Sequence, residues 1–204
     1  TNFSTVSETV STEIARNATL AVVVAAIAIL IYISIAFRAL PKPWLYGSAA
    51  IIAVLHDAFI ILGLFAFLGE FHGTEVDTAF ITAILTVIGF SVHDTIVVFD
   101  RIRENLAHNP GEPFESVVNY SLAQTFVRSL NTSLTVVFTL LALFLFGGES
   151  TRNFVLALLI GIISGTYSSI FNASQLLVAW ENGEIQSFFR RITRQAPAPV
   201  APQA

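Results

Sequence analysis

The segment AFITAILTVIGFSVHDTIVVF (Ala79–Phe99) is a long apolar run with one ionisable pair, His93-Asp94. A helix that crosses a bilayer needs about 20 predominantly apolar residues, so this segment predicts a membrane-spanning helix. A charged side chain at the bilayer centre costs about 2.5–3.5 kcal/mol on insertion scales. We therefore expect Asp94 to face the protein interior, about three-quarters along its span, and to have a function.

The composition of the whole chain supports a membrane protein. The 204 residues are 54% hydrophobic and 12% charged, whereas soluble domains carry about 25% charged residues. The net charge is −4 and the basic residues are scattered, so a nucleic-acid-binding surface is not predicted. The chain has no cysteine and no methionine, which excludes disulfides and predicts a processed form or part of a longer protein. We expect no metal and no cofactor.

Five segments reach or approach the length of a span, and we predict an all-α bundle of five transmembrane helices. They are Ala18–Phe37, Trp44–Leu68, Ala79–Phe99, Leu130–Phe146 and Phe154–Ala179. Residues 1–16 are expected to end an extracytoplasmic domain, residues 17–180 to form the membrane domain, and residues 181–204 to form a tail that is disordered at its end. The fourth span is short, and its helix can also begin earlier, near Val117.

The longest connection, residues 100–129, is polar and is broken by NPGEP at Asn109–Pro113. We expect its flanks, 101–108 and 114–120, to form helices at the membrane surface. Basic residues are concentrated on one side, which the positive-inside rule assigns to the cytoplasm. The N-terminus is then outside and the C-terminus cytoplasmic. On the cytoplasmic side lie Arg38, Lys42, Arg101, Arg103, Arg128, Arg190, Arg191 and Arg194, and on the other side Arg16 and Arg152.

Polar residues inside the spans predict a hydrophilic seam through the bundle. A second acidic pair, His56-Asp57, lies near the middle of the second span. Two spans also carry polar or small residues at intervals of three or four, which places them on one helix face. These are Gln124, Arg128, Asn131, Thr132, Thr135 and Thr139 in the fourth span, and Gly161, Ser164, Gly165, Ser168, Asn172 and Gln175 in the fifth. The alternative is a purely structural role: static hydrogen bonds between helices for the polar residues, and close helix packing for Gly161 and Gly165.

One motif points to a known family. The stretch VIGFSVHDTIVVFDRIREN (Val87–Asn105) resembles the signature IGYS-x-x-D-(S/T)-I-V-V-x-D-R-I-R-E-N of the SecF members of the SecD/SecF family. Three further stretches are similar to that family in the same order: LHDAFIILG (Leu55–Gly63), SLAQTFVRSLNTSLT (Ser121–Thr135) and LFGGES (Leu145–Ser150). Together they cover most of residues 18–180.

The resemblance implies half of a transmembrane domain of the resistance-nodulation-division type, from SecF or from a fused SecDF. It implies a subunit of the accessory complex of the Sec translocon, which uses the proton motive force to promote preprotein translocation across the bacterial inner membrane. The implied partners are SecD, the SecYEG translocon, a YajC-type small subunit, unfolded preprotein and membrane lipid. It also implies that a first span and an extracytoplasmic domain precede residue 18.

The resemblance also implies a proton relay. Asp94 matches the acid of the signature span, and Arg128 matches the arginine of the family's Q-T-x-x-R-(S/T) segment, while a third acid lies on SecD. Many relatives carry Asn at the position of His93, so its part in the path stays open. The accessory polar path is expected to draw on His93, Asp57, His56, Gln124, Asn131 and Thr135.

Two other functions compete with protein export. Two acids on neighbouring spans resemble an intramembrane aspartyl protease in outline, but those enzymes use Tyr-Asp and Gly-x-Gly-Asp, whereas here each acid follows histidine. We therefore expect no enzymatic activity. The second alternative is a small-molecule or lipid exporter of the same transporter superfamily, which would carry a large porter domain outside the membrane.

Overall fold

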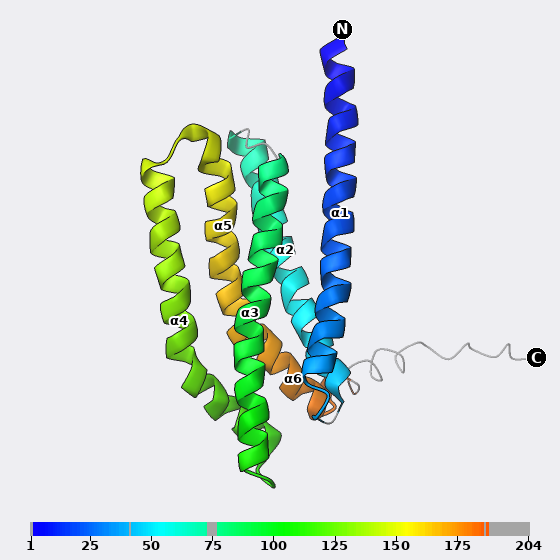
Figure 1. The fold of residues 1–204 in the computed structure, drawn as a ribbon, viewed down its shortest axis with the longest axis vertical. Coiled ribbons are helices and arrows are strands. Elements are labelled where there is room, and N and C mark those ends of the chain that lie inside the picture. The colour runs from blue at the N-terminus through cyan, green and yellow to red at the C-terminus, as the bar shows by residue number, and fades with distance from the viewer. Residues whose placement is uncertain (1, 41, 73–76, 186, 188–204) are drawn as a thin grey trace, which may run out of the picture.

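The computed structural model describes residues 2–40, 42–72, 77–185 and 187, and these residues form helices joined by short connections (Figure 1). The helices are α1 (Asn2–Ala36), α2 (Pro43–His72), α3 (Thr78–His108), α4 (Phe114–Phe146), α5 (Glu149–Tyr167), the π-helical turn η1 (Ser168–Asn172) and α6 (Ala173–Glu181). Because α5, η1 and α6 follow one another without a break, they form one long helix. The all-α prediction is confirmed.

Five of these helical stretches are long and apolar enough to cross a membrane. They are Thr19–Ala36, Pro43–Phe71, Thr78–His108, Phe114–Phe146 and Glu149–Glu181. The fourth begins well before the apolar run that predicted it. The segments 101–108 and 114–120 are not separate surface helices, because they continue α3 and α4 without a break.

These extensions have a physical reason. Hydropathy marks the part of a helix that lies in lipid, whereas the helix itself continues until a residue breaks it. Beyond Phe99, ion pairs one turn apart, Arg103–Asp100 and Arg101–Glu104, support the polar end of α3. The connection is then only residues 109–113, where Gly111 has a φ of +103°, a conformation that favours glycine.

Two helices form the centre of the bundle. In α3 and the α5–α6 helix, 50% and 61% of the most apolar window is buried, against 6% in α1 and 11% in α4. The two central helices approach closely at Gly161 and Gly165. A Cβ atom on Gly161 would overlap the side chain of Val87, and one on Gly165 would lie 3.1 Å from Cβ of Ser91. Gly161 and Gly165 therefore serve close helix packing, which is the structural role that the sequence offered as the alternative.

The outer helices are arranged differently. Helix α1 extends beyond the rest of the bundle at its N-terminal end and joins it near its C-terminal end (Figure 1). Phe37 there stacks on Tyr46 with ring centroids 5.7 Å apart, and Phe99 meets the Tyr46 ring edge-on at 5.4 Å. The α1–α2 and α3–α4 connections lie at this end, and the α4–α5 connection lies at the other (Figure 1).

The two ends differ in their number of basic residues. Arg38, Lys42, Arg101 and Arg103 lie at or next to the α1–α2 and α3–α4 connections, while Arg152 follows the α4–α5 connection. The arginines of the tail, Arg190, Arg191 and Arg194, and the tail's expected disorder lie outside the described residues. Which end faces the cytoplasm stays a prediction.

Candidate functional site

Asp94 is buried in the interface between α3 and α4. Its residue is 7% exposed, and its Oδ1 accepts a hydrogen bond of 2.7 Å from Oγ of Ser129 on α4. Its Oδ2 is also buried but has no hydrogen-bond partner among the described residues. A buried oxygen without a donor is costly when the group is ionised, so this carboxyl group has room for either a proton or a further donor.

The partner helix presents a row of buried hydroxyl groups to this interface. Ser121, Thr125, Ser129 and Ser133 follow one another at intervals of four residues and are all buried. Ser133 also accepts a hydrogen bond of 2.6 Å from Thr166 of α5. The hydroxyls of Ser121, Ser129 and Ser133 bond α4 to α3 and α5, and this row forms the polar seam beside Asp94.

This row differs from the one that the sequence was expected to turn inward. The residues Gln124, Arg128, Asn131, Thr132, Thr135 and Thr139, which we expected to face inward, are all exposed in this chain. The expectation of an inward stripe is therefore wrong for α4 within this chain. The corresponding stripe of the fifth span is largely buried, since Gly161, Ser164, Gly165 and Ser168 all lie inside, while Gln175 is exposed.

Arg128 is exposed on α4 and is not paired with Asp94 among the described residues. The arginine directly precedes Ser129, which donates to Asp94, and the described ion pairs do not include one between Arg128 and Asp94. It lines a pocket of about 310 Å³ near the polar end of α3. The other lining residues are Ile96, Val97, Asp100, Arg101, Glu104 and Thr125.

The remaining candidates on α3 and α4 form no hydrogen bond with the carboxyl group of Asp94 among the described residues. Gln124 Oε1 accepts hydrogen bonds from Arg101 Nε at 2.6 Å and from Asn105 Nδ2 at 2.8 Å. The backbone carbonyl of Asn131 accepts from the hydroxyl of Thr135 at 2.8 Å. His93 is exposed on the surface of α3.

Asp57 forms a second and different polar centre. Its residue is 1% exposed, and serine hydroxyls from other helices donate to both of its oxygens. Ser164 donates to Oδ1 at 2.9 Å, and Ser91 and Ser168 donate to Oδ2 at 2.7 Å each. The ring nitrogen Nδ1 of His56 lies 3.2 Å from Oδ1. This carboxyl group is therefore well supplied with donors, in contrast to Asp94.

The π-helical turn η1 builds much of this centre. A π turn adds a residue to the helical repeat, and here two consecutive serines, Ser168 and Ser169, are both fully buried. Ser169 donates to the backbone carbonyl of Ser91 at 2.9 Å and accepts from Thr95 at 2.9 Å. Thus η1 ties Asp57 of α2 to two polar residues of α3.

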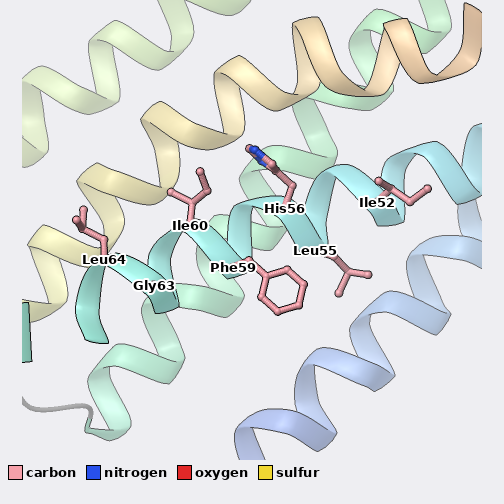
Figure 2. A pocket seen from close by; sticks show the side chains of 7 residues that line it. All are labelled: Ile52, Leu55, His56, Phe59, Ile60, Gly63 and Leu64. Carbon is pink, nitrogen blue, oxygen red and sulfur yellow. The ribbon is translucent and has the colours of Figure 1, made fainter. Parts of the chain in front are cut away.

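His56 connects the second centre to the surface of the bundle. It borders an apolar groove of about 820 Å³ along α2, with Ile52, Leu55, Phe59, Ile60, Gly63 and Leu64. Figure 2 shows the imidazole pointing toward the orange helix of the α5–α6 stretch, whereas Leu55 and Phe59 point the opposite way. On that orange side lies a second groove of about 620 Å³, lined by His56, Ile52, Ala53, Tyr167, Phe171, Asn172, Gln175, Leu176 and Ala179.

Comparison with known proteins identifies the family. Residues 1–183 match the family described as "Protein export membrane protein SecD/SecF, C-terminal". The chain belongs to the SecD/SecF family. Over 196 residues it is 58% identical to the protein translocase subunit SecF of Thermobaculum terrenum, covering 96% of this chain and 62% of that protein. It is 46% identical to the protein translocase subunit SecDF of Bacillus subtilis, covering 91% of this chain and 24% of that one.

Solved structures of the family share the fold. The chain resembles a crystal structure of SecDF in the super-membrane-facing form with a TM-score of 0.75 and 41% identity, covering 88% of this chain and 23% of that one. A crystal structure of SecDF from Thermus thermophilus gives a TM-score of 0.74 and 45% identity, covering 82% and 22% of the two chains. The chain therefore has the fold of one membrane part of SecDF, and it spans less than two-thirds of these relatives. These relatives are named as protein translocase subunits, and translocation is a transport function.

Proposed function

We propose that this chain is the SecF membrane part of the SecDF accessory complex of the Sec translocon. In that role it uses the proton motive force to promote preprotein translocation across the bacterial inner membrane. The family match over residues 1–183 supports the place in the complex. The observation that carries the proton step is the buried carboxyl group of Asp94, with one oxygen bonded to Ser129 and the other without a partner among the described residues.

In the proposed mechanism Asp94 takes up and releases a proton. Burial without a cationic partner favours the neutral acid, and approach of a guanidinium favours the carboxylate. Arginine does not lose its own proton in proteins, so Arg128 acts as the fixed counter-charge. The pocket that Arg128 lines with Thr125 and Asp100 gives it space to withdraw from Asp94 or to approach it.

Coupling requires that the two states open to opposite sides of the membrane. A proton that binds Asp94 from one side and leaves to the other then passes down the gradient. The membrane potential contributes about 2.3 kcal/mol per charge per 100 mV. His93, His56, Asp57, Gln124, Asn131 and Thr135 are proposed as accessory polar residues, and Asp57 is treated further below.

The test measures preprotein translocation in inside-out vesicles with and without a proton gradient. We expect Asp94→Asn and Arg128→Leu each to abolish the stimulation by the gradient while the protein still assembles with SecD. Asp57→Asn should have a smaller effect. The matched control is Asp77→Asn on the same helix: Asp77 caps the N-terminus of α3 through a 2.8 Å bond to Phe80 N, and asparagine caps equally well. An Asp94→Asn protein that responds fully to the gradient would refute the relay.

The exposed polar face of α4 supports the proposed partnership with SecD. Arg128, Asn131 and Thr135 lie uncovered on a helix that is long and apolar enough to span the membrane. Polar side chains at membrane depth face protein or a water-filled cavity rather than lipid. We propose that SecD helices, on a separate chain or on a fused one, cover this face and the region around Asp94. SecYEG, a YajC-type subunit and unfolded preprotein complete the proposed set of partners.

The arrangement of the two acids bears on the protease alternative. An aspartyl protease needs two carboxyl groups that share one site. Here Asp94 is bonded to Ser129 of α4, and Asp57 is bonded to Ser91, Ser164 and Ser168. The two acids share no hydrogen-bond partner within the described part of the chain, which supports transport over proteolysis.

A further inference from the structure

Asp57 is a buried titratable group that the Asp94–Arg128 relay does not use. Its hydrogen-bond partners belong to α3, α5 and η1, whereas Asp94 is bonded to α4. From α3, α5 and η1, the side chains that bond it are all serines. Among the described residues, His56 is the one titratable or charged side chain within ion-pair distance of it.

The hydroxyl groups around Asp57 are arranged so that they can change partners. An ionised carboxylate accepts all of its donors, but a protonated acid must itself donate from one oxygen. Both donors to Oδ2 have a second partner within reach. Ser168 Oγ lies 3.2 Å from the carbonyl oxygen of Gly165, and Ser91 Oγ lies 3.5 Å from Oγ of Ser169. A proton on Oδ1 can be donated back to the neutral Nδ1 of His56, and a hydroxyl whose bond to Oδ2 weakens has a second acceptor, so no buried donor is left unpaired.

The centre also has a route to the surface. Nδ1 of His56 is 3.2 Å from Asp57 Oδ1, and 36% of the His56 side chain is exposed against 1% of the Asp57 side chain. Imidazole is the side chain that ordinarily exchanges protons near neutral pH. The groove that it borders on the α6 side carries two polar residues one turn apart, Asn172 at the end of η1 and Gln175 in the first turn of α6.

We propose that His56 and Asp57 form a second proton-binding site of this chain. Protons reach the site from the groove between α2 and the η1–α6 helix. The protonation state of the site controls how strongly Asp57 binds the hydroxyl groups of the π turn. The doubly protonated ring of His56 gives its Nδ1 proton to Oδ1 of Asp57. The N–H bond breaks as the O–H bond forms, and a neutral imidazole and a neutral acid remain. The ring then takes its next proton from water that reaches the groove.

The structural consequence falls on η1. Hydrogen bonds to an ionised acceptor are roughly twice as strong as neutral ones. Ionised Asp57 therefore holds Ser168 of the π turn firmly against α2, and proton uptake weakens that bond. The turn lies between α5 and α6 in the central helix of the bundle, so loosening it changes how α6 sits against α2. This proposal does not depend on protein export, because it concerns proton binding within the chain.

The test is infrared difference spectroscopy of the full-length protein in liposomes while the pH is lowered. We expect a carbonyl-stretch band of a protonated carboxylic acid that is lost in Asp57→Asn and retained in Asp94→Asn. Ser168→Ala should keep this band but shift its frequency, because it removes one hydroxyl bond to Oδ2. His56→Phe should keep the amplitude but slow the appearance of the band after a pH jump. The matched control for that variant is His108→Phe, an exposed histidine at the end of α3 that belongs to neither proposed site.

A labelling experiment tests the effect on the π turn. The chain has no native cysteine, so Gln175→Cys reports on the groove alone. Its labelling rate should rise as the pH falls in the otherwise unchanged protein, and it should not depend on pH when Asp57→Asn is added. A carboxylic acid band of the Asp94→Asn protein that persists unchanged when Asp57→Asn is added would overturn the proposal. If Asp57→Asn does not fold, a band whose frequency is unchanged in Ser168→Ala, or whose rate is unchanged in His56→Phe, would overturn it equally.

Discussion

At the scale of single residues, the state of Asp94 depends on Ser129. We predict that Ser129→Ala reduces the gradient-dependent part of translocation about tenfold, because a hydrogen bond to a charged group contributes about 1.5–3 kcal/mol. Ser129→Thr should preserve function, since it keeps the hydroxyl group that donates at 2.7 Å. The measurement is the initial rate of translocation in vesicles at a fixed gradient.

The control for this substitution lies one turn further along α4. Ser133 is equally buried, but its hydroxyl bonds to Thr166 and to the carbonyl of Ser129, and not to the acid. Ser133→Ala should therefore leave the response to the gradient close to that of the unchanged protein. Equal responses from both alanine variants would argue against a special role of Ser129.

At the scale of helices, the close contact between α3 and α5 requires residues without a side chain on α5. We predict that Gly161→Leu lowers the free energy of unfolding by about 1–3 kcal/mol or more, because overpacking of a filled core strains its neighbours. The side chain of Val87 already occupies the space where a Cβ would stand. Thermal unfolding in detergent or denaturant titration of the purified complex gives the measurement.

Gly63 in α2 supplies the comparison, because a Cβ there meets nothing within 4 Å. Gly63→Ala should leave stability unchanged or raise it by up to about 1 kcal/mol, since alanine has the better helix propensity. A Gly161→Leu protein as stable as Gly63→Ala would contradict the packing that the structure assigns to the α3–α5 contact.

At the scale of the whole molecule, the distribution of charge predicts the orientation. Single cysteines at Asn109 and Gly148 lie in connections at opposite ends of the bundle (Figure 1). We expect Asn109→Cys to react only from the cytoplasmic side, and Gly148→Cys only from outside. Gly148 is preferable to Gly147, where a Cβ would overlap the carbonyl oxygen of Leu143. Reaction of Asn109→Cys with an impermeant reagent added from outside would show that the predicted orientation is wrong.

The uncovered face of α4 leads to a prediction about assembly. We expect this chain to aggregate when it is purified alone and to become stable when it is produced with SecD. A cysteine at Asn131 should crosslink to SecD, whereas one at Ile31, which is 53% exposed on α1, should not. A monodisperse, thermally stable preparation of the chain alone would count against this interface.

The sequence by itself determined the class of the protein and the number of its spans. Both follow from hydropathy, because a helix in lipid must be apolar over a fixed length. It also placed Asp57 and Asp94 at membrane depth and marked Gly161 and Gly165 as a packing pair. Hydropathy underestimated the length of α4, because the first half of that helix, from Phe114 onward, is helical but polar.

Only the tertiary structure decided which polar row of α4 faces inward. One row contains Ser121, Thr125, Ser129 and Ser133, and the adjacent one contains Gln124, Arg128, Asn131 and Thr135. Both have helical spacing, so periodicity cannot choose between them. The inward row consists only of small hydroxyl side chains, which fit the narrow space against α3 and α5, whereas the adjacent row includes the long side chains of Gln124 and Arg128, which stay outside.

The surroundings of Asp57 were likewise decided by packing. Its donors Ser164 and Ser168 lie one turn apart in the stripe that the sequence showed, but Ser91 belongs to α3, and no local pattern relates that serine or Asp57 to the stripe. The π turn that buries Ser168 and Ser169 together adds a residue to the helical repeat. Such a turn is stable because the buried hydroxyls find partners on α2 and α3, and those partners exist only once the helices have come together.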